Sequence, residues 1–254
     1  MFAAAGIDID RGPANLPGAR IASFEIAEDD PRWEVAQRLA STYKITDFVR
    51  TEFSETELES ASALCIVASG NRGYPEPSKG LGFLESTYDL SEYCIDCGTG
   101  LRQVRPFQIG FSPNLRRTIM QLNWVFDEFF VDREVWTEVF KPFGVKCWPV
   151  QSSKTGDTLD TIVQLQISER TRLKLEGEHQ PTCSCCGRVK FPIEFRGFAP
   201  SPSDIPAPIF KSIETFGADR TSFSRVFVSS GVFESIRRSG LRGVQFYPCL
   251  HTGG

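Results

Sequence analysis

The chain has 254 residues and a formal net charge of −4; 41% of the residues are hydrophobic and 24% are charged. These values are those of an ordinary globular protein and exclude bulk disorder, and the acidic total argues against a nucleic-acid-binding domain. No stretch approaches the run of about 20 apolar residues that a membrane-spanning helix needs, and the N-terminus shows no secretory signal. We therefore expect a cytoplasmic protein without a membrane partner, in which the eight cysteines stay reduced.

The first 84 residues are expected to form an α/β segment without a recognisable motif. Asp30 followed by Pro31 is typical of a helix start, since proline is favoured at the first helical position. Ser54 and Glu57 have the spacing of a capping box at the start of a second helix. The expected elements are a strand over residues 21–26, a helix over 31–43, a helix after Ser54, a buried strand over 64–68 and a loop over 70–82.

The rest of the chain alternates short apolar runs with turn residues, which predicts an α+β fold. The expected strands cover residues 103–111, 125–131, 145–150, 161–167, 225–228 and 243–247. The expected helices cover residues 115–122, 135–140 and 231–239, and a Pro-rich loop covers 200–208.

Two parts of the chain resemble each other. Residues 130–136 match residues 227–233, and residues 144–149 match residues 243–248. Each copy is predicted to be a strand, a short helix, a glycine turn and a second strand. We therefore expect an internal duplication that gives two similar halves, with chance similarity as the alternative. The predicted division is an N-terminal segment 1–84, a first half 85–157 and a second half 158–254, packed as one compact unit.

Each half also contains a cysteine knuckle, with the sequence CIDCG at residues 94–98 and CSCCG at 183–187. A CxxC pair places two thiolates on one side of a metal ion, and the following glycine allows a tight turn. Two such pairs supply the four ligands of a tetrahedral zinc site. The sequence therefore predicts one structural Zn²⁺, shared between the halves in a zinc-ribbon-like site and bound by Cys94, Cys97, Cys183 and Cys186.

Other uses of the cysteines remain open at this point. The pairs could form disulfides, within or between the knuckles, or stay as bare thiols. Cys185 is interpreted as a spectator, although it could exchange with a neighbouring ligand, and His179 could replace a cysteine. The remaining three cysteines lie in apolar surroundings and are expected in the core: Cys65, Cys147 and Cys249.

The sequence offers little support for an enzyme. It contains only two histidines, His179 and His251, and neither a GxxxxGK[ST] nor a GxGxxG phosphate loop. A zinc ion with four cysteine ligands has no open position at which to activate water. The neighbouring acids Asp127 and Glu128 are interpreted as a solvated face. We therefore expect no catalytic residues.

Two sets of surface charges are candidates for partner binding. Residues 25–59 contain ten acidic residues against four basic ones. The predicted acidic face consists of Glu28, Asp29, Asp30, Glu55, Glu57 and Glu59, and helix N-terminal acids favoured by the helix dipole are the alternative. Basic residues near the knuckles could instead form a nucleic-acid patch, although the acidic total disfavours this: Arg102, Arg105, Arg116, Arg117, Arg188 and Lys190.

The two CxxCG motifs, the chain length and the closing segment FVSSGVFESIRRSGLRGVQFYP together resemble the double-CxxCG-motif immunity proteins of bacterial toxin–immunity systems. The resemblance covers roughly residues 85–250, and Cys185 is an additional cysteine within the motif. The resemblance implies a cytoplasmic protein that binds and neutralises a cognate toxin. The alternative, which the knuckles and their neighbouring basic residues suggest, is a zinc-ribbon nucleic-acid-binding or regulatory protein. For a basic toxin, an acidic face would speed capture.

Overall fold

The computed structural model describes residues 6–7, 15–16, 19–20, 24–27, 29–44, 51–111, 113–175, 182–193 and 196–249. The chain forms two compact units, Met1–Arg50 and Thr51–Gly254. In the first unit, β1 (Asn15–Leu16) pairs with β2 (Ala19–Arg20), and α1 spans Pro31–Thr42. The helix begins where the sequence predicts, because the Asp30 side chain accepts a hydrogen bond from the backbone N–H of Arg32.

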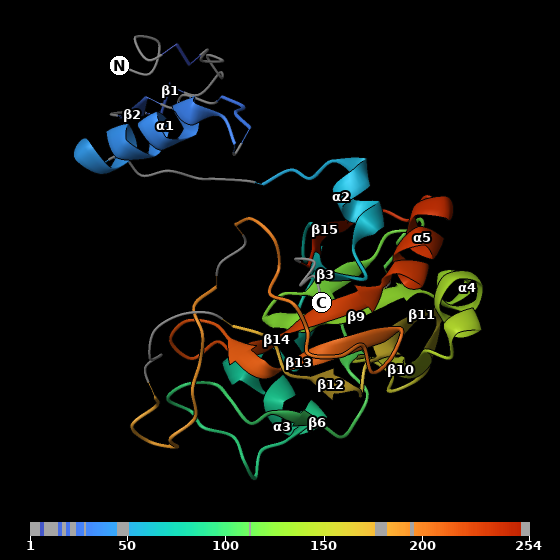
Figure 1. Cartoon of the computed structure of the whole chain (residues 1–254). Coiled ribbons are helices and arrows are strands. Elements are labelled where there is room, and N and C mark those ends of the chain that lie inside the picture. Colours follow the sequence, from blue (N-terminus) through green and yellow to red (C-terminus); the bar gives the residue numbers. More distant parts are fainter. Residues whose placement is uncertain are drawn as a thin grey trace. The chain divides into compact units, whose positions relative to one another are not determined.

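The second unit is mostly β-sheet with few helices, which confirms the α+β class (Figure 1). Its helices are α2 (Glu55–Ser60), η2 (Lys79–Leu81), α3 (Phe83–Thr87), α4 (Arg133–Val135), the π-helical turn η3 (Trp136–Phe140), η4 (Lys141–Phe143) and α5 (Ser230–Arg238). Its strands are β3 (Ala63–Ala68), β4 (Pro75–Glu76), β5 (Tyr88–Asp89), β6 (Arg102–Gln103), β7 (Gln108–Ile109), β8 (Met120–Leu122), β9 (Val125–Asp132), β10 (Lys146–Ser152), β11 (Thr158–Gln166), β12 (Arg170–Thr171), β13 (Ile209–Phe216), β14 (Phe223–Ser229) and β15 (Val244–Pro248).

Two larger sheets organise this unit. One has the strand order β4-β7-β10-β11-β9-β8, and the other has the order β12-β13-β14-β3-β15. Strands β5 and β6 form a separate small ribbon next to the first knuckle. The two large sheets meet at β9 and β14, where the Ser224 N–H donates to Asp127 Oδ2 over 3.1 Å and Phe126 packs against Phe223.

The same local topology occurs once in each large sheet. Strands β9 and β10 are parallel, are joined through α4 and its continuation, and flank the antiparallel strand β11. Strands β14 and β15 are likewise parallel, are joined through α5, and flank the antiparallel strand β3. The two central strands differ in their place in the chain. Strand β11 directly follows β10, whereas β3 precedes β14 by many elements. The two connecting helices are neighbours, and Ser235 Oγ donates to the Val139 carbonyl over 3.4 Å (Figure 1).

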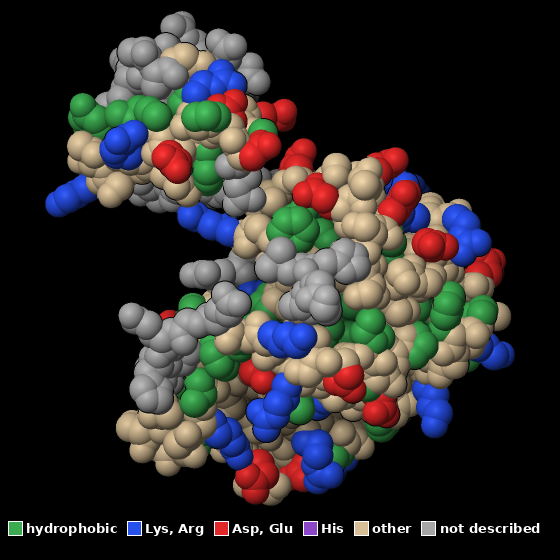
Figure 2. Space-filling view, viewed as in Figure 1, with side chains coloured by type: hydrophobic (Ala, Val, Ile, Leu, Met, Phe, Trp, Pro, Cys, Tyr) green, Lys and Arg blue, Asp and Glu red, His purple; other side chains and the backbone are tan. Residues whose placement is uncertain are grey.

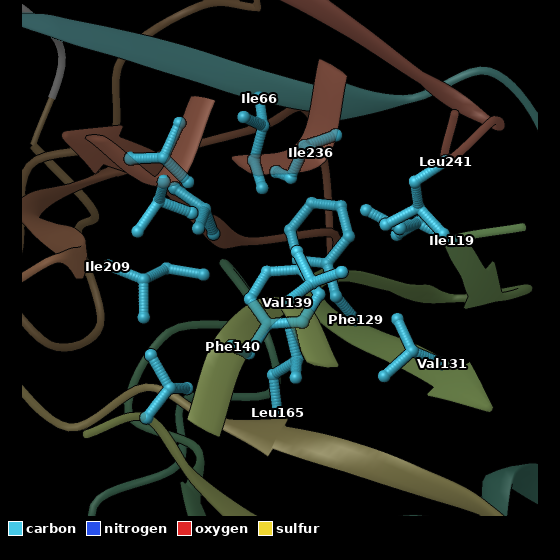
Figure 3. Close-up of a cluster of buried hydrophobic side chains, with 14 of the residues drawn as sticks. Ile66, Ile119, Phe129, Val131, Val139, Phe140, Leu165, Ile209, Ile236 and Leu241 are labelled. Carbon is cyan, nitrogen blue, oxygen red and sulfur yellow. The ribbon is translucent and has the colours of Figure 1, made fainter. Parts of the chain in front are cut away.

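The central core lies between the two sheets and beneath these helices. Figure 3 shows side chains from both sheets pointing toward one another around Phe129 and Phe140. Both rings are fully buried, as is Val139 at 1% exposure. Side chains along a strand point alternately to its two faces. The residues between those of the central core therefore point to the opposite face of each sheet, where they line an outer core. Phe130 of β9 belongs to one outer core and Phe227 of β14 to the other.

The structure corrects one predicted helix. Residues 115–122 were expected to be helical, but they form an irregular segment that ends in the short strand β8. Arg116 and Arg117 have φ values of 47° and 58°, in the left-handed region, which no right-handed helix can accommodate. The strand expected over residues 103–111 is also divided, into β6 and β7. The predicted capping box is confirmed, since Ser54 and Glu57 exchange hydrogen bonds at the start of α2.

Strand β3 shows how the chain order and the spatial order differ. The sequence-based division assigned residues 63–68 to the N-terminal segment, and the structure places them between β14 and β15 of the five-stranded sheet. The division at residues 84 and 157 stays a prediction.

We expect Ile236→Ala to lower the free energy of unfolding by about 2–5 kcal/mol, because Ile236 is 1% exposed and packs in the central core. Ile205→Ala is the matched control, since Ile205 is 42% exposed and should change stability by about 0.5 kcal/mol or less. Urea unfolding followed by circular dichroism measures both. Equal effects of the two substitutions would contradict the packing described here.

Candidate metal centre and adjoining cleft

The two cysteine knuckles have the same backbone hydrogen bonds. The Cys94 N–H donates to the Thr99 carbonyl over 2.9 Å, and the Gly98 N–H donates to the Cys94 carbonyl over 2.8 Å. The Cys183 N–H donates in the same way to the Arg188 carbonyl over 2.9 Å. Each turn thus directs both of its thiols to the same side.

The glycine of the first knuckle also permits a close approach. Gly98 has φ 77°, and a Cβ on it would lie 2.1 Å from the Arg220 carbonyl oxygen. Gly187 of the second knuckle has φ 70° but open space around it. Positive φ therefore explains glycine at both positions, and only Gly98 is also required by its neighbour.

The four predicted cysteine ligands come together. The Sγ atoms of Cys94 and Cys183 are 3.8 Å apart, those of Cys97 and Cys186 are 3.6 Å apart, and all four lie within 4.8 Å of one another. Zinc–sulfur bonds of about 2.3 Å place the corners of a tetrahedron about 3.8 Å apart. These four residues, here called the four-cysteine set, could therefore hold a metal ion, and their thiols are free rather than paired in disulfides.

Two basic side chains that follow the second knuckle, Arg188 and Lys190, bind to the first knuckle and to the residues before it. Lys190 Nζ donates to the Cys97 carbonyl over 2.9 Å, and to carbonyls of the 219–221 turn. Arg188 donates to the Glu92 carbonyl over 2.6 Å and forms an ion pair with its carboxylate at 2.7 Å. Four thiolates around a divalent cation carry a net charge of −2, so two cations at this position are favourable.

Hydrogen bonds favour the thiolate form of one ligand. Burial alone raises the pKa of Cys97, but hydrogen bonds from the Thr99 hydroxyl and backbone and from the Cys186 and Cys94 thiols outweigh it and lower the pKa to about 6. The Thr99 Oγ1 atom lies 3.1 Å from the Cys97 sulfur. A thiolate is the form that binds metal.

The remaining cysteines lie outside the four-cysteine set. Cys185 is exposed, and its hydrogen bonds with Cys94 and Asp96, together with the charges of those groups, raise its pKa to about 11. Cys65 and Cys249 are buried core residues, as predicted, and burial raises the pKa of each thiol to about 12. Cys147 is half-buried and packs against the central core. His179 and His251 lie outside the described residues.

Most of the predicted acidic contact residues have structural roles. Asp30 caps α1, and hydrogen bonds from Arg32 lower its pKa to about 2. Glu57 belongs to the capping box of α2, and hydrogen bonds from Ser54 lower its pKa. The other four positions divide as follows: Glu55 and Glu59 form ion pairs with Arg237, Asp29 is exposed, and Glu28 lies outside the described residues. Asp29 and Asp30 belong to the first unit, and the three other described acids to the second.

The basic residues near the knuckles are also engaged within the protein. Arg102 forms an ion pair with Asp89, and Arg105 donates to the Glu85 carbonyl. Arg117 forms an ion pair with Glu138 at 2.9 Å. On the face shown in Figure 2, charges of both signs alternate over the second unit. These partners within the protein account for the positions of Arg102, Arg105 and Arg117, so a bound nucleic acid is not needed to explain them.

A cleft of about 970 Å³ adjoins the knuckles. Residues of β9, β11, β12 and β13 line it, together with Gly98 of the first knuckle and with Arg188 and Val189, which follow the second. Its volume lies at the upper end of the range of about 300–1,000 Å³ that is typical of ligand sites. Its rim carries three exposed apolar side chains: Trp124 at 45%, Ile213 at 46% and Val189 at 39% exposure.

A buried ion pair lies in the wall of this cleft. Lys211 Nζ donates to Glu128 Oε1 over 2.5 Å and lies 3.5 Å from Asp127, and the Lys211 side chain is 4% exposed. The other carboxylate oxygen of Glu128 accepts from Gln164 over 2.9 Å, and Gln164 exchanges two amide hydrogen bonds with Gln103. The interpretation of Glu128 as part of a solvated face is therefore wrong.

The charge of Lys211 is stabilised by its partners. Burial alone lowers the pKa of Lys211, but the charges of Asp127 and Glu128 outweigh burial, so the pKa lies above its usual value. Burial raises the pKa of Glu128, and Lys211 opposes this shift. Sequence reasoning missed this pair, although a lysine inside the apolar strand β13 and a glutamate inside the apolar strand β9 were visible signals.

None of the described helices is long and apolar enough to cross a membrane. Comparisons with protein-family models, with curated proteins and with solved structures find no match to this chain. The resemblance to immunity proteins stays a prediction.

Metal binding at the four-cysteine set predicts that Cys97→Ser loses the tightly held metal and lowers the unfolding free energy, because three ligands no longer close the site. Cys147→Ser, which changes a half-buried cysteine outside the set, should keep both metal and stability. Metal analysis after dialysis and urea unfolding measure these properties. A Cys97→Ser protein with a full equivalent of metal and unchanged stability would contradict the site.

The buried ion pair predicts that Lys211→Met lowers the unfolding free energy by about 3–5 kcal/mol, because it leaves Glu128 and Asp127 without their cation. Adding Glu128→Gln should restore part of this loss. Arg238→Met is the control, since it removes an exposed ion pair and an exposed hydrogen bond, both with Glu234, and should change stability by about 0.5 kcal/mol or less. Additive effects of Lys211→Met and Glu128→Gln in urea unfolding would show that the pair is not coupled.

Proposed function

We propose that the four-cysteine set binds one structural zinc ion in a zinc-ribbon-like centre. Four sulfur ligands at tetrahedral spacing suit zinc, and a closed set leaves no position for substrate or water. Cys94 and Cys97 are 5% and 7% exposed, which suits a stable rather than a reactive centre. The ion would join two segments that lie 89 residues apart in the chain.

We also infer that the two strand–helix–strand units arose by internal duplication. Support comes from equivalent residues that face the central core: Val131 and Val228, Val135 and Val232, Val139 and Ile236. Strands β15 and β3 are also paired as the two strands of a β-hairpin are, although no turn connects them. Pro248 pairs with Leu64, as the matching Pro149 pairs with Val163 in the connected hairpin β10–β11. A duplicated unit whose last strand is supplied by β3 accounts for both observations.

The function that we propose is neutralisation of a cognate toxin by direct binding in the cytoplasm, without catalysis. The observation that carries it is the exposed rim of the cleft. Trp124 and the exposed Arg172 are of the residue types that dominate protein–protein binding energy. Ile213 and Val189 add apolar area around them. The resemblance to immunity proteins supports the same function.

We propose a segment of the toxin as the occupant of this cleft. The wall is polar and already paired, with Lys211, Glu128 and Gln164 bonded to one another. Such a wall would keep its shape while the apolar rim buries surface area against a partner. A wall that is already ordered lowers the entropy lost on binding. The acidic residues of α2 remain a second predicted contact, since helix capping and ion pairing leave them at the surface.

A nucleic-acid-binding function is less well supported. The basic residues that suggested it have internal partners, as Arg188 does in Glu92 and Arg117 in Glu138. The net charge of −4 further weakens attraction to phosphates.

The experiment is to look for a toxin-like gene immediately upstream and to co-purify the tagged protein with the product of that gene. We expect a stable complex, and we expect Trp124→Ala combined with Ile213→Ala to weaken it by about 30-fold or more, as two lost hot-spot contacts imply. The exposed Ile205→Ala, which lies away from the cleft, serves as the control. Calorimetric titration measures the dissociation constants.

Two outcomes would contradict this function. Unchanged affinity of the double variant for the toxin would show that the cleft is not the contact surface. Tight nucleic-acid binding with a steep salt dependence, and no toxin in the complex, would favour the alternative function.

A further inference from the structure

The additional cysteine of the second knuckle belongs to a second cluster of metal-binding atoms. The sulfur atoms of Cys185 and Cys94 and a carboxylate oxygen of Asp96 lie within 4.8 Å of one another. Cys94 therefore belongs to both clusters. We call the cluster of Cys94, Asp96 and Cys185 the outer set.

The two sets differ in exposure and in completeness. Cys185 and Asp96 are exposed, whereas Cys94 is buried. The four-cysteine set supplies a full tetrahedron of ligands. The outer set supplies two sulfur atoms and one carboxylate, which leaves one position of a tetrahedron open to water. Thiolates select soft or borderline cations such as zinc, cadmium and cobalt over magnesium and calcium.

We propose that the outer set binds a second divalent, thiophilic metal ion in an open and exchangeable site beside the four-cysteine set. The Cys94 thiolate would bridge the two ions, since its sulfur has more than one lone pair. This bridging mode rests on the proposed metal ion in the four-cysteine set.

Charge balance supports double occupancy. The outer set adds two negative ligands, the Cys185 thiolate and the Asp96 carboxylate, and one divalent cation, so it leaves the net charge unchanged. The −2 charge of the first metal with its four thiolates is partly offset by Lys190 and by Arg188, which also pairs with Glu92.

The outer set also has a route to the four-cysteine set. An ion in the outer set would already share one ligand with the buried centre. Ligand exchange through Cys94 would then carry it inward without complete loss of its sulfur ligands. Because the outer set is exposed and has one ligand fewer, we expect it to bind more weakly and to lose its ion first to a chelator.

The test is titration of the reduced, metal-free full chain with cadmium, followed by cadmium-113 NMR and metal analysis. We expect two bound equivalents in the unaltered protein, with one signal from a four-sulfur site and one from a site of mixed sulfur and oxygen ligands. Cys185→Ser should keep only the four-sulfur signal. Asp96→Asn should weaken the second site by about tenfold or more, as loss of a charged ligand implies.

Control variants separate this proposal from the proposed zinc centre. Cys147→Ser should retain both equivalents, and Cys186→Ser should lose the four-sulfur signal. If the unaltered chain binds one equivalent and Cys185→Ser binds the same with the same signal, the outer site is refuted while the four-cysteine centre stands. If Cys186→Ser leaves the four-sulfur signal intact, the proposed zinc centre fails instead.

Discussion

Four sulfur atoms within 4.8 Å of one another constrain the whole knuckle region. Thiolates at that spacing repel one another strongly in a partly buried site unless a cation lies between them. The chain meets this constraint by bringing together two identical turns that lie 89 residues apart. Lys190 and Arg188 then tie the second turn to backbone carbonyls of the first. Gly98 of the first turn and Arg188 and Val189, which follow the second, line the cleft, so the contact between the turns also shapes the cleft.

Features that depend on local chain geometry could be predicted from the sequence. The CxxCG spacing identified the knuckle cysteines, and Ser54 with Glu57 identified the start of α2. The helix expected over residues 115–122 was wrong because apolar spacing does not reveal the positive φ values of Arg116 and Arg117. The proximity of the four sulfur atoms is a non-local result. Spacing within each knuckle suggested it, and only the fold establishes it.

The order of the strands and the buried ion pair could not be predicted from local sequence patterns. Strand β3 is inserted between β14 and β15 although it precedes them by more than a hundred residues in the chain. Glu128 on β9 and Lys211 on β13 lie in different sheets, so neither strand alone predicts the pair. The acidic residues of α2 show the opposite case. Their abundance suggested a binding face, and the structure assigns Glu57 to capping and Glu55 and Glu59 to Arg237.

The buried Lys211–Glu128 pair is a weak source of stability, because removing two charges from water offsets most of their attraction. Its geometry suggests another role. Glu128 is bonded on one oxygen by Lys211 and on the other by Gln164, so its carboxylate is held in one orientation. These side chains come from three strands of two sheets. We interpret the pair as a contact that fixes the position of one sheet relative to the other along the cleft. The proposed binding surface would need this fixed geometry more than additional stability.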